Sequence, residues 1–480
     1  MSKVDLGGTP LHFIGIGGIG MSALAQITAE RGIPVSGSDV RSSHITQRLE
    51  SVGATIFLTQ EAANLNRIMS FQPATSLVSV SGSGNVVNSE VLPQVVCSTA
   101  IAKSNPEFQA AQSLGCPIFH RSDLLAALID RYSSIAVSGT HGKTTTSSMI
   151  GYMLLKADLD PTIIVGGEVD AWQGNARVGQ GEYLVAEADE SDGSLVKHSP
   201  TIGIITNIEL DHPDRYSSLD EVVDIFQTFV DQCEVVIGCL DDEVVRDRIQ
   251  LDLSYSLDAN SDADYVAKNI RYSAEGSSAE VWERGQLLGT LKLQLLGNHN
   301  LSNALSAVAV GRKIGLSFEA ITSGLSQFSG TKRRFETKGE VNQIKFIDDY
   351  AHHPKEISVT LAAAKLKVVE KVHKRVIAIF QPHRYSRTET FLSEFAASFG
   401  DADVAIVTDI YSAGEANPNN ITGETLAQAI RQHHSQVHYH PDLNSLPSFL
   451  QREILQPEDL VLFLGAGNLN QYIAKTIELY

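Results

Sequence analysis

The sequence predicts an α/β protein built from three domains with mostly parallel sheets. Three observations lead to this prediction. A chain of 480 residues favours roughly three units of ordinary domain size. A short apolar strand, a glycine-rich turn and a helix-like stretch follow one another twice, at residues 11–30 and again at residues 134–158. Beyond residue 370, three strand-like runs each lead into a polar or glycine-containing loop, which is typical of an open parallel sheet.

Composition narrows the class of protein. Hydrophobic residues make up 43% of the chain and charged residues 19%, which is typical of a globular protein. The formal net charge of -19 argues against nucleic acid as the main partner. The longest apolar runs are too short to span a bilayer, and the N-terminal stretch resembles the start of a folded domain rather than a signal. Four cysteines without C-x-x-C spacing favour a reducing compartment, so we expect a cytoplasmic protein without membrane insertion.

The first unit, residues 1–133, contains a G-x-G-x-x-G pattern between an expected strand and an expected helix. Its glycines are Gly15, Gly17 and Gly20, and an acidic residue, Asp39, follows about 20 residues later. Such a turn brings backbone N–H groups and a helix N-terminus close to a diphosphate. We therefore expect a Rossmann-like domain whose binding site also includes Gly18 and Ser38. The alternative is a turn that serves only helix–sheet packing. A polar stretch further on, residues 79–89, is expected to form turns and loop.

The second unit, residues 134–332, contains a second phosphate-binding pattern in the segment GTHGKTT. The usual first glycine of such loops is replaced by Val137, which weakens a generic P-loop assignment. The ammonium of Lys143 and the hydroxyl of Thr144 nevertheless suit the outer phosphates and Mg²⁺ of a nucleoside triphosphate. We expect a P-loop-type ATPase domain in which ATP contacts Gly139, Thr140, His141, Gly142, Lys143, Thr144 and Thr145.

Two further residues of this unit are candidate metal ligands alongside Thr144. Glu187 ends a β-branched apolar run, where a carboxylate can bind Mg²⁺, although it could equally be a helix cap or a surface charge. His212 follows the next such run, and a single histidine is more often an ordinary core or surface residue than a ligand.

The third unit, residues 333–480, combines two polar motifs. The segment DDYAHHP contributes Asp349 and His352, and the segment QPHRYSR contributes Arg384 and Arg387. Guanidinium groups bind carboxylates with two parallel hydrogen bonds, so a substrate with a carboxylate is expected, with a solvated basic loop as the alternative. The adjacent histidines of DDYAHHP do not predict a zinc site, because neighbouring side chains cannot readily face one ion.

Taken together, these motifs resemble those of the ATP-dependent muramyl-peptide ligases along the whole chain. The matching segments are GIGGIGMS, GTHGKTTT, EADESDGS, TNIELDH, GNHNLSNALSA, RRFE, DDYAHHP, QPHRYSR and GAGN. In this family the loop G-T-x-G-K-[ST] lacks the first P-loop glycine, which accounts for Val137. The resemblance implies that the first unit binds the UDP part of a sugar nucleotide and that the C-terminal unit is Rossmann-like. It also implies that ATP meets Asn300, Asn303 and Arg334.

The resemblance implies the reaction as well: L-alanine is joined to the lactyl carboxylate of UDP-N-acetylmuramate through an acyl phosphate, with ATP and Mg²⁺. The implied catalytic residues are Lys143, Glu187, His212, Asp349 and His352, and those facing the carboxylate and the amino acid are Tyr350, His352, Arg384 and Arg387. Ligases for later amino acids usually carry a modified lysine, but no lysine lies between His212 and Lys268, which fits the first step. We expect a monomer or weak homodimer whose third unit closes onto the second.

Other functions remain open from the sequence alone. A recycling ligase that attaches a whole tripeptide to the same sugar nucleotide would share these motifs. A nicotinamide-dependent oxidoreductase would use Gly15, Gly17, Gly20 and Asp39 but would leave Lys143 and Thr144 without a task. A nucleotide-binding regulator would bind ATP without turnover.

Overall fold

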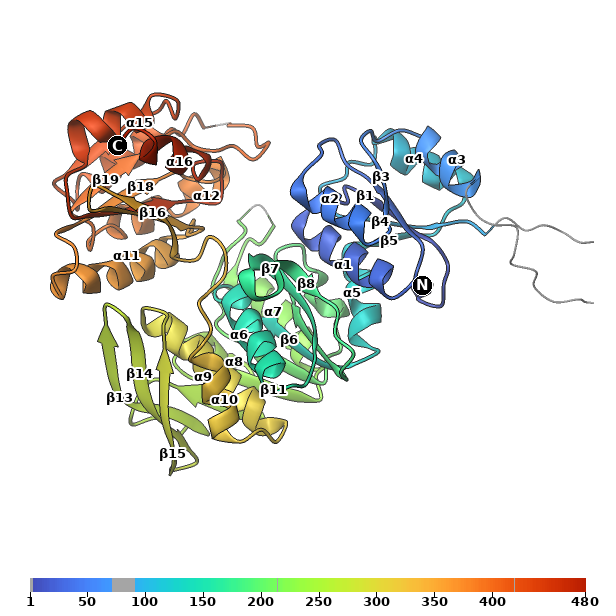
Figure 1. The fold of residues 1–480 in the computed structure, drawn as a ribbon, viewed down its shortest axis with the longest axis horizontal. Coiled ribbons are helices and arrows are strands. Elements are labelled where there is room, and N and C mark those ends of the chain that lie inside the picture. Colours follow the sequence, from blue (N-terminus) through green and yellow to red (C-terminus); the bar gives the residue numbers. More distant parts are fainter. Residues whose placement is uncertain (1–2, 71–90, 214, 418) are drawn as a thin grey trace, which may run out of the picture.

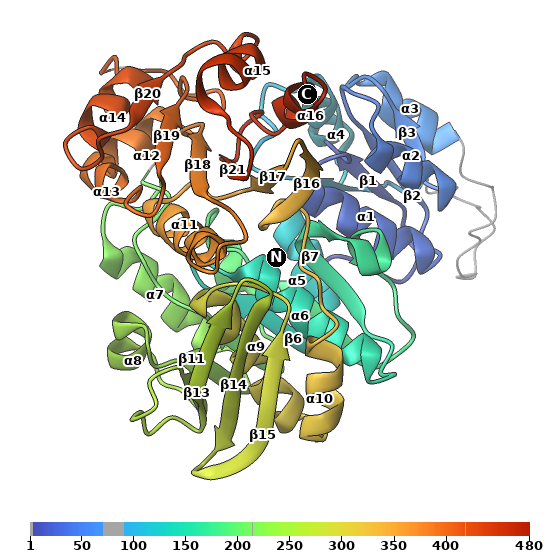
Figure 2. The ribbon, with the colours of Figure 1, turned by 60° about the vertical axis from the view of Figure 1, so that its left-hand side comes forward.

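The computed structural model describes residues 3–70, 91–213, 215–417 and 419–480, and shows one sheet in each of three α/β domains. The N-terminal and C-terminal domains lie beside each other on the same side of the middle domain (Figures 1 and 2). This confirms the predicted α/β class with mostly parallel sheets. The loop expected at residues 79–89 lies outside the described residues.

The N-terminal domain is a five-stranded parallel sheet in the order β3-β2-β1-β4-β5, covered by helices. The order reverses between β1 and β4, where doubly wound folds bind ligands. The strands are β1 (Leu11–Ile14), β2 (Val35–Ser38), β3 (Thr55–Phe57), β4 (Gln94–Cys97) and β5 (Ile118–His120), and the helices are α1 (Ile19–Glu30), α2 (His44–Ser51), α3 (Ala63–Ser70), α4 (Pro106–Leu114) and α5 (Arg121–Ile129).

The middle domain has a ten-stranded sheet in the order β15-β14-β13-β12-β11-β10-β6-β9-β7-β8. Its centre, from β13 to β7, is parallel, whereas β8, β14 and β15 pair antiparallel at the two edges. The strands are β6 (Ser133–Ser138), β7 (Thr162–Val169), β8 (Gly174–Arg177), β9 (Tyr183–Glu187), β10 (Ile202–Ile205), β11 (Val235–Cys239), β12 (Leu253–Ser256), β13 (Tyr265–Ser273), β14 (Gly276–Glu283) and β15 (Gln286–Leu293). The helices are α6 (Lys143–Lys156), α7 (Leu219–Val230), α8 (Glu243–Arg248), α9 (Asn298–Lys313) and α10 (Phe318–Leu325).

The C-terminal domain has a six-stranded sheet in the order β16-β17-β21-β18-β19-β20, parallel except for the β16–β17 hairpin. The strands are β16 (Glu336–Val341), β17 (Ile344–Asp349), β18 (Arg375–Phe380), β19 (Val404–Val407), β20 (Val437–Tyr439) and β21 (Asp459–Leu464). The helices are α11 (Pro354–Val369), α12 (Tyr385–Thr390), α13 (Leu392–Ala397), α14 (Gly423–Ile430), α15 (Leu446–Phe449) and α16 (Gln471–Ile477).

Helix α1 joins the first two domains. Its residues 21–28 are all buried, including polar Gln26 and Thr28, because the helix packs against its own sheet and also against β7 and β8. One apolar cluster accordingly contains α1 residues together with Ile164, Ala176 and Ala186 of the middle domain. The core of the C-terminal domain is instead separate from both. The first glycine-rich turn is therefore fixed to the middle domain by apolar packing.

Two class predictions can be compared with the structure. Within the described residues, no helix is both long and apolar enough to cross a membrane. The four cysteines, Cys97, Cys116, Cys233 and Cys239, are free thiols.

Candidate functional site

The first glycine-rich turn, residues 15–20, links β1 to α1 as expected. Gly15 has a φ of +80°, which favours glycine, and its N–H donates to the Ser38 carbonyl at 2.8 Å. The Gly17 N–H donates to the Asp39 carboxylate at 2.9 Å, and a Cβ on Gly17 would lie only 2.8 Å from the same Oδ2. Gly18 caps α1 without a side chain. Asp39 therefore shapes the turn, while the Ser38 hydroxyl is buried and donates to Glu107.

The phosphate-binding loop, residues 139–144, links β6 to α6. Gly139 has a φ of +129°, and Gly142, the N-cap of α6, has a φ of +83°. The first turn of α6 reads Lys-Thr-Thr-Thr and carries no acidic side chain, so its free N–H groups and helix dipole favour an anion. These features suit the phosphates of a nucleotide.

Lys143 points back over this loop. Its Nζ donates to the carbonyl oxygen of Gly139 at 2.6 Å and to both carboxylate oxygens of Glu190 at 2.9 and 3.0 Å. Burial favours the neutral amine, but the charges of Glu190, Asp189 and Glu187 outweigh it and raise the pKa of Lys143 above its usual value. Lys143 is therefore a firmly protonated cation at the turn. The sequence analysis assigned no role to its partner Glu190.

Thr144 and Glu187 lie together, as the metal prediction requires. The Thr144 hydroxyl donates to Glu187 Oε1 at 3.1 Å, and the Gly166 N–H donates to Oε2 at 2.6 Å. A hydroxyl and a carboxylate are oxygen donors of the kind that Mg²⁺ prefers. His212 is half-buried with a φ of +56°, and burial lowers its pKa despite the nearby Asp211 charge. A neutral imidazole of this kind can bind a metal ion.

Arg121, the first residue of α5, connects the two glycine-rich turns. Its side chain lies beside Gly20, since a Cβ added to Gly20 would be 3.5 Å from Arg121 Nη1. Its Nη2 is 2.9 Å from Asp192 Oδ2 and 3.7 Å from Asp189 Oδ2. Asp189 Oδ1 in turn lies 4.0 Å from Lys143 Nζ. One ionic network therefore runs from Arg121, which lies beside the first turn, to Lys143 of the phosphate-binding loop. The sequence analysis did not identify Arg121, because its role depends on the packing of two domains.

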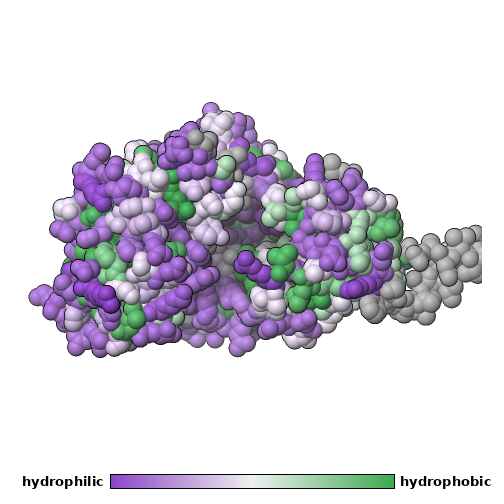
Figure 3. Space-filling view, turned by 90° about the horizontal axis from the view of Figure 1, so that it is seen from above, coloured by the Kyte–Doolittle hydropathy of each residue, from purple (hydrophilic) through white to green (hydrophobic). Residues whose placement is uncertain are grey.

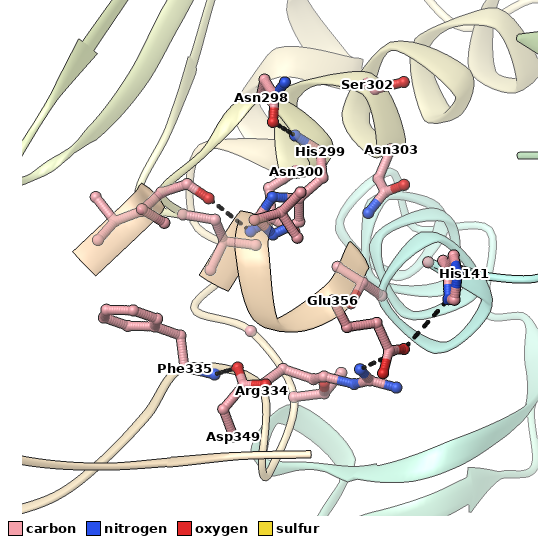
Figure 4. Close-up of a pocket in the computed structure, with 18 of the residues that line it drawn as sticks. His141, Asn298, His299, Asn300, Ser302, Asn303, Arg334, Phe335, Asp349 and Glu356 are labelled. Carbon is pink, nitrogen blue, oxygen red and sulfur yellow. Dashed lines mark hydrogen bonds and ion pairs between the residues drawn. The ribbon is translucent and has the colours of Figure 1, made fainter. Parts of the chain in front are cut away.

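A cleft of about 940 Å³ opens beside the phosphate-binding loop, between the middle and C-terminal domains. Figure 4 shows that Asn300 and Asn303 of α9 lie on one side of it and Arg334 on the other. Asn303 lies directly against Gly142, where a Cβ would be 2.8 Å from its Oδ1, while Asn300 Nδ2 donates to the Leu296 carbonyl at 2.8 Å. His141, Gly142 and Thr145 also line the cleft, so most of the expected ATP residues lie at or beside it.

Asp349 organises the segment that enters the C-terminal domain. Its buried carboxylate accepts hydrogen bonds from the N–H groups of Phe335 at 2.7 Å and Ala351 at 2.8 Å. Burial raises the pKa of Asp349 to about 6, although the Arg334 charge opposes the shift. Asp349 therefore holds the position of Arg334 in the cleft wall.

Glu356 is a site residue that the sequence analysis missed. It lies in the first turn of α11, and its carboxylate approaches His141 Nδ1 at 3.4 Å, Arg334 Nη1 at 3.7 Å and His352 Nδ1 at 3.1 Å. The ion pair to His141 crosses from the C-terminal domain to the phosphate-binding loop, as Figure 4 shows. A helix-start pattern, with Pro354 at the first position and a glutamate two residues later, could have identified it.

His352 and Tyr350 lie next to each other, with ring centroids 5.2 Å apart. His352 Nδ1 is 3.0 Å from the Tyr350 carbonyl oxygen, which can only accept a hydrogen bond. The proton of a neutral His352 is therefore on Nδ1, which leaves Nε2 as the basic nitrogen. The Tyr350 ring also faces the guanidinium groups of Arg333 and Arg334 at 4.8 and 5.4 Å.

The two arginines of QPHRYSR differ in their surroundings. Arg387 is buried and donates from Nε and Nη2 to Asp211 Oδ1 at 3.1 and 3.0 Å, which makes a second ionic bridge between the C-terminal and middle domains. This bridge was not anticipated. Arg384 has a φ of +70° and lies 3.4 Å from Glu415.

The face seen in Figure 3 is hollowed between the N-terminal and C-terminal domains.

Comparisons with known proteins agree with this geometry. The chain matches the Mur ligase family, catalytic domain, over residues 10–133, the Mur ligase middle domain over residues 137–311, and the Mur ligase, glutamate ligase domain over residues 333–467. It is 63% identical over 491 residues to a UDP-N-acetylmuramate–L-alanine ligase of Gloeothece citriformis, with 99% of both chains covered. It is 62% identical to the enzyme of that name from Nostoc punctiforme, covering 99% of this chain and 97% of the relative.

Solved structures give the same result. The crystal structure of a UDP-N-acetylmuramate-alanine ligase from Thermotoga maritima superposes with a TM-score of 0.80 at 28% identity, covering 98% of this chain and 99% of the other. A murein peptide ligase from Psychrobacter arcticus shares the fold, with a TM-score of 0.68 at 24% identity and 98% of both chains covered. The sequence matches, the three-domain fold and the arrangement of the phosphate-binding loop together show that this chain belongs to the Mur ligase family.

Proposed function

We propose that this protein joins L-alanine to the lactyl carboxylate of UDP-N-acetylmuramate at the expense of ATP, giving UDP-N-acetylmuramoyl-L-alanine, ADP and phosphate. The relatives with about 60% identity over nearly the whole chain carry the name of this activity. The observation that carries the proposal is the series of ionic contacts from Arg121, whose side chain lies beside Gly20, through Asp189 to Lys143. This series supports the proposal because it links the turn expected to bind a diphosphate to the loop expected to bind a triphosphate.

The two nucleotides then occupy different domains. The UDP group lies on the first turn, with Gly15, Gly17, Gly18 and Gly20 providing close backbone approach and Ser38 and Asp39 shaping the turn. ATP lies in the cleft, with its phosphates on residues 139–145 and its base near Asn300, Asn303 and Arg334. The N-terminus of α6 and the Lys143 ammonium stabilise the negative charge that develops during phosphoryl transfer.

The Mg²⁺ ion of this reaction would bind Thr144 and Glu187, with His212 as a further ligand. The pairing of the Thr144 hydroxyl with Glu187 at 3.1 Å already brings two oxygen ligands together. When bound, the ion would neutralise phosphate charge and favour transfer of the terminal phosphoryl group. His212 would be its nitrogen ligand.

The reaction is completed by residues of the C-terminal domain. The lactyl carboxylate attacks the γ-phosphorus and displaces ADP, which forms an acyl phosphate. The amine of alanine then attacks the carbonyl carbon and displaces phosphate. His352 Nε2 is the available base for the ammonium proton, while Tyr350, Arg384 and Arg387 bind carboxylates. Asp349 acts by positioning Arg334.

We also propose domain boundaries at residues 1–133, 134–332 and 333–480, a cytoplasmic location and a monomer or weak homodimer. The extents of the three sheets support these boundaries to within one residue, since β6 of the middle sheet begins at Ser133. Closure of the C-terminal domain is supported by the polar character of its contacts with the middle domain, which can break and re-form more readily than an apolar core.

A coupled ADP-release assay tests the function. With UDP-N-acetylmuramate and ATP, ADP release should depend on L-alanine, and the product should be the alanyl sugar nucleotide by mass. Release with the L-alanyl-γ-D-glutamyl-diaminopimelate tripeptide, and none with L-alanine, would overturn the proposal in favour of the recycling ligase. Release with neither amine would contradict both ligase assignments.

A further inference from the structure

We propose that His141, Glu209 and His353 form a binding site for a borderline divalent cation of the Zn²⁺ class, at the contact between the phosphate-binding loop and the C-terminal domain. One ligand atom from each residue lies within 4.8 Å of those from the other two. The site is distinct from Thr144, Glu187 and His212, and it does not depend on the ligase reaction.

Hydrogen bonds to their backbone groups hold the first two ligand residues, His141 and Glu209, in place. The His141 N–H donates to Asn207 Oδ1 at 2.9 Å, and its carbonyl accepts from Thr206 Oγ1 at 2.6 Å and Asn207 Nδ2 at 3.0 Å. The Glu209 N–H donates to Thr140 Oγ1 at 2.8 Å. The phosphate-binding loop and the segment after β10 are thus tied together, which brings His141 Nε2 to 3.5 Å from Glu209 Oε2. Fixed ligand positions of this kind are what a metal site requires.

His353 supplies the third ligand and the strongest argument for a cation. It is 6% exposed, and among the described residues neither of its ring nitrogens has a hydrogen-bond partner. Its ring lies against His141, with centroids 4.7 Å apart, and Phe391 packs edge-on at 4.9 Å. A buried imidazole without partners costs free energy, and a proton shared between His141 and a carboxylate does not satisfy it. A metal ion bound to one of the ring nitrogens of His353 would give that nitrogen a partner.

Glu356 and Lys355 contact the ligand residues His141 and Glu209 from outside the proposed metal site. Histidine ligands usually donate their second N–H to a carboxylate, which fixes the ring and makes the other nitrogen more basic. Glu356 Oε1, 3.4 Å from His141 Nδ1, is placed for this role. Lys355 contacts Glu209 through Oε1, which leaves Oε2 for an ion.

The donor set determines the class of cation. Two imidazole nitrogens and one carboxylate oxygen suit Zn²⁺ or Co²⁺, whereas Mg²⁺ prefers oxygen ligands. Because His353 belongs to the C-terminal domain and the other two ligands to the middle domain, a bound ion would hold the two domains together. The sequence motif DDYAHHP did not predict this site, since only one of its two histidines takes part and the other ligands lie far away in the chain.

Co²⁺ titration of the whole protein tests the proposal, because tetrahedral Co²⁺ absorbs strongly in the visible range. Excess Mg²⁺ is present to occupy the oxygen-rich site at Thr144 and Glu187. We expect one equivalent of Co²⁺ to bind with a tetrahedral spectrum and to be displaced by Zn²⁺. His353→Gln and, independently, Glu209→Gln should abolish this spectrum, and Glu356→Gln should weaken binding about 10- to 100-fold while retaining it.

Two control variants make the result decisive. His433→Gln removes an exposed histidine of the same domain and should leave the titration unchanged. His212→Gln should also leave it unchanged if the ion binds where we propose. Loss of the spectrum in His212→Gln with retention in His353→Gln would overturn the proposal, as would absence of tetrahedral Co²⁺ binding to the parent protein. In the latter case, the residues form only an ionic contact through His141.

Discussion

The two glycine-rich turns have similar local structures but different surroundings. Both follow a buried parallel strand and begin a helix at a glycine N-cap. The first turn is closed by an acidic side chain, Asp39, and its helix α1 is buried between two sheets in one apolar cluster. The second turn has the Lys143 cation and the Thr144–Glu187 pair, and the domain above it is attached through ionic contacts such as Arg387–Asp211.

This difference indicates how one motif serves two tasks. Backbone N–H groups on a rigid helix are enough to hold a diphosphate that does not react. A phosphoryl group that is transferred needs a positioned cation, metal ligands and a cover that can open for release of product. In our proposal, the chain therefore combines a fixed holding site with a site that can open and close.

The largest effect is expected from removing the Lys143 ammonium. Lys143→Ala should lower kcat for alanine-dependent ADP release by at least about 100-fold, because a cation that stabilises transition-state charge is lost. Steady-state kinetics with saturating ATP measure this. A rate within a few-fold of the parent protein would show that the second turn works, like the first, through its backbone alone.

The control for this variant concerns Glu190, which is buried and would lose its partner. An unpaired buried carboxylate can cost about 3–5 kcal/mol, so Lys143→Ala could be inactive merely because it is unstable. Lys143→Ala combined with Glu190→Gln removes the unpaired charge. We expect the double variant to recover thermal stability and to remain inactive.

The next test alters one glycine in each of the two glycine-rich turns. Gly17→Ala places a Cβ 2.8 Å from Asp39, and Gly142→Ala places one 2.8 Å from Asn303 at a φ of +83°. We expect the first to raise KM for the sugar nucleotide, and the second KM for ATP, each about 10-fold or more, since small displacements of bound groups are costly. Gly400→Ala, with open space around its Cβ, is the matched control. Equal changes of both KM values in either variant would contradict the assignment of one nucleotide to each turn.

Many features of the two glycine-rich turns could be predicted from the sequence. The strand, turn and helix around Gly15–Gly20 and around Lys143 were predicted correctly, because the signal lies within about 20 adjacent residues. The antiparallel hairpins of β13–β15 were not anticipated, although Glu283-Arg284-Gly285 is a typical turn sequence there. Arg121 was missed because its partners Asp189 and Asp192 lie in another domain, whereas Glu356 was missed although the helix start at Pro354 offered a local signal. Contacts such as those of Arg121 depend on tertiary packing, which a local sequence pattern does not predict.

The ionic contacts that attach the C-terminal domain above the second turn can be tested at the buried Arg387–Asp211 bridge. Arg387→Met leaves Asp211 without its partner, and opening of the domain would let water solvate that carboxylate. We therefore expect a larger radius of gyration in small-angle scattering and a kcat/KM for alanine lowered about 5- to 10-fold, with little change in melting temperature. Adding Asp211→Asn should leave activity low, since Arg387 also binds substrate in our proposal. A lowered melting temperature without expansion would indicate a rigid joint like that of α1.

The smallest expected effect concerns Asp349 and pH. Its folded pKa of about 6 exceeds the usual value of 3.8, so the folded protein binds a proton more tightly than the unfolded chain. The stability contributed by the protonated form is complete below about pH 4 and is lost as pH rises through 6. The stability of the parent protein relative to Asp349→Asn should thus fall by at most about 1.4 kcal/mol per pH unit in this window. The difference between their urea unfolding free energies measures this and cancels contributions from other carboxylates such as Asp211. A difference independent of pH would mean that Asp349 is ionised beneath Arg334, and that the cover of the second turn is an ion pair there too.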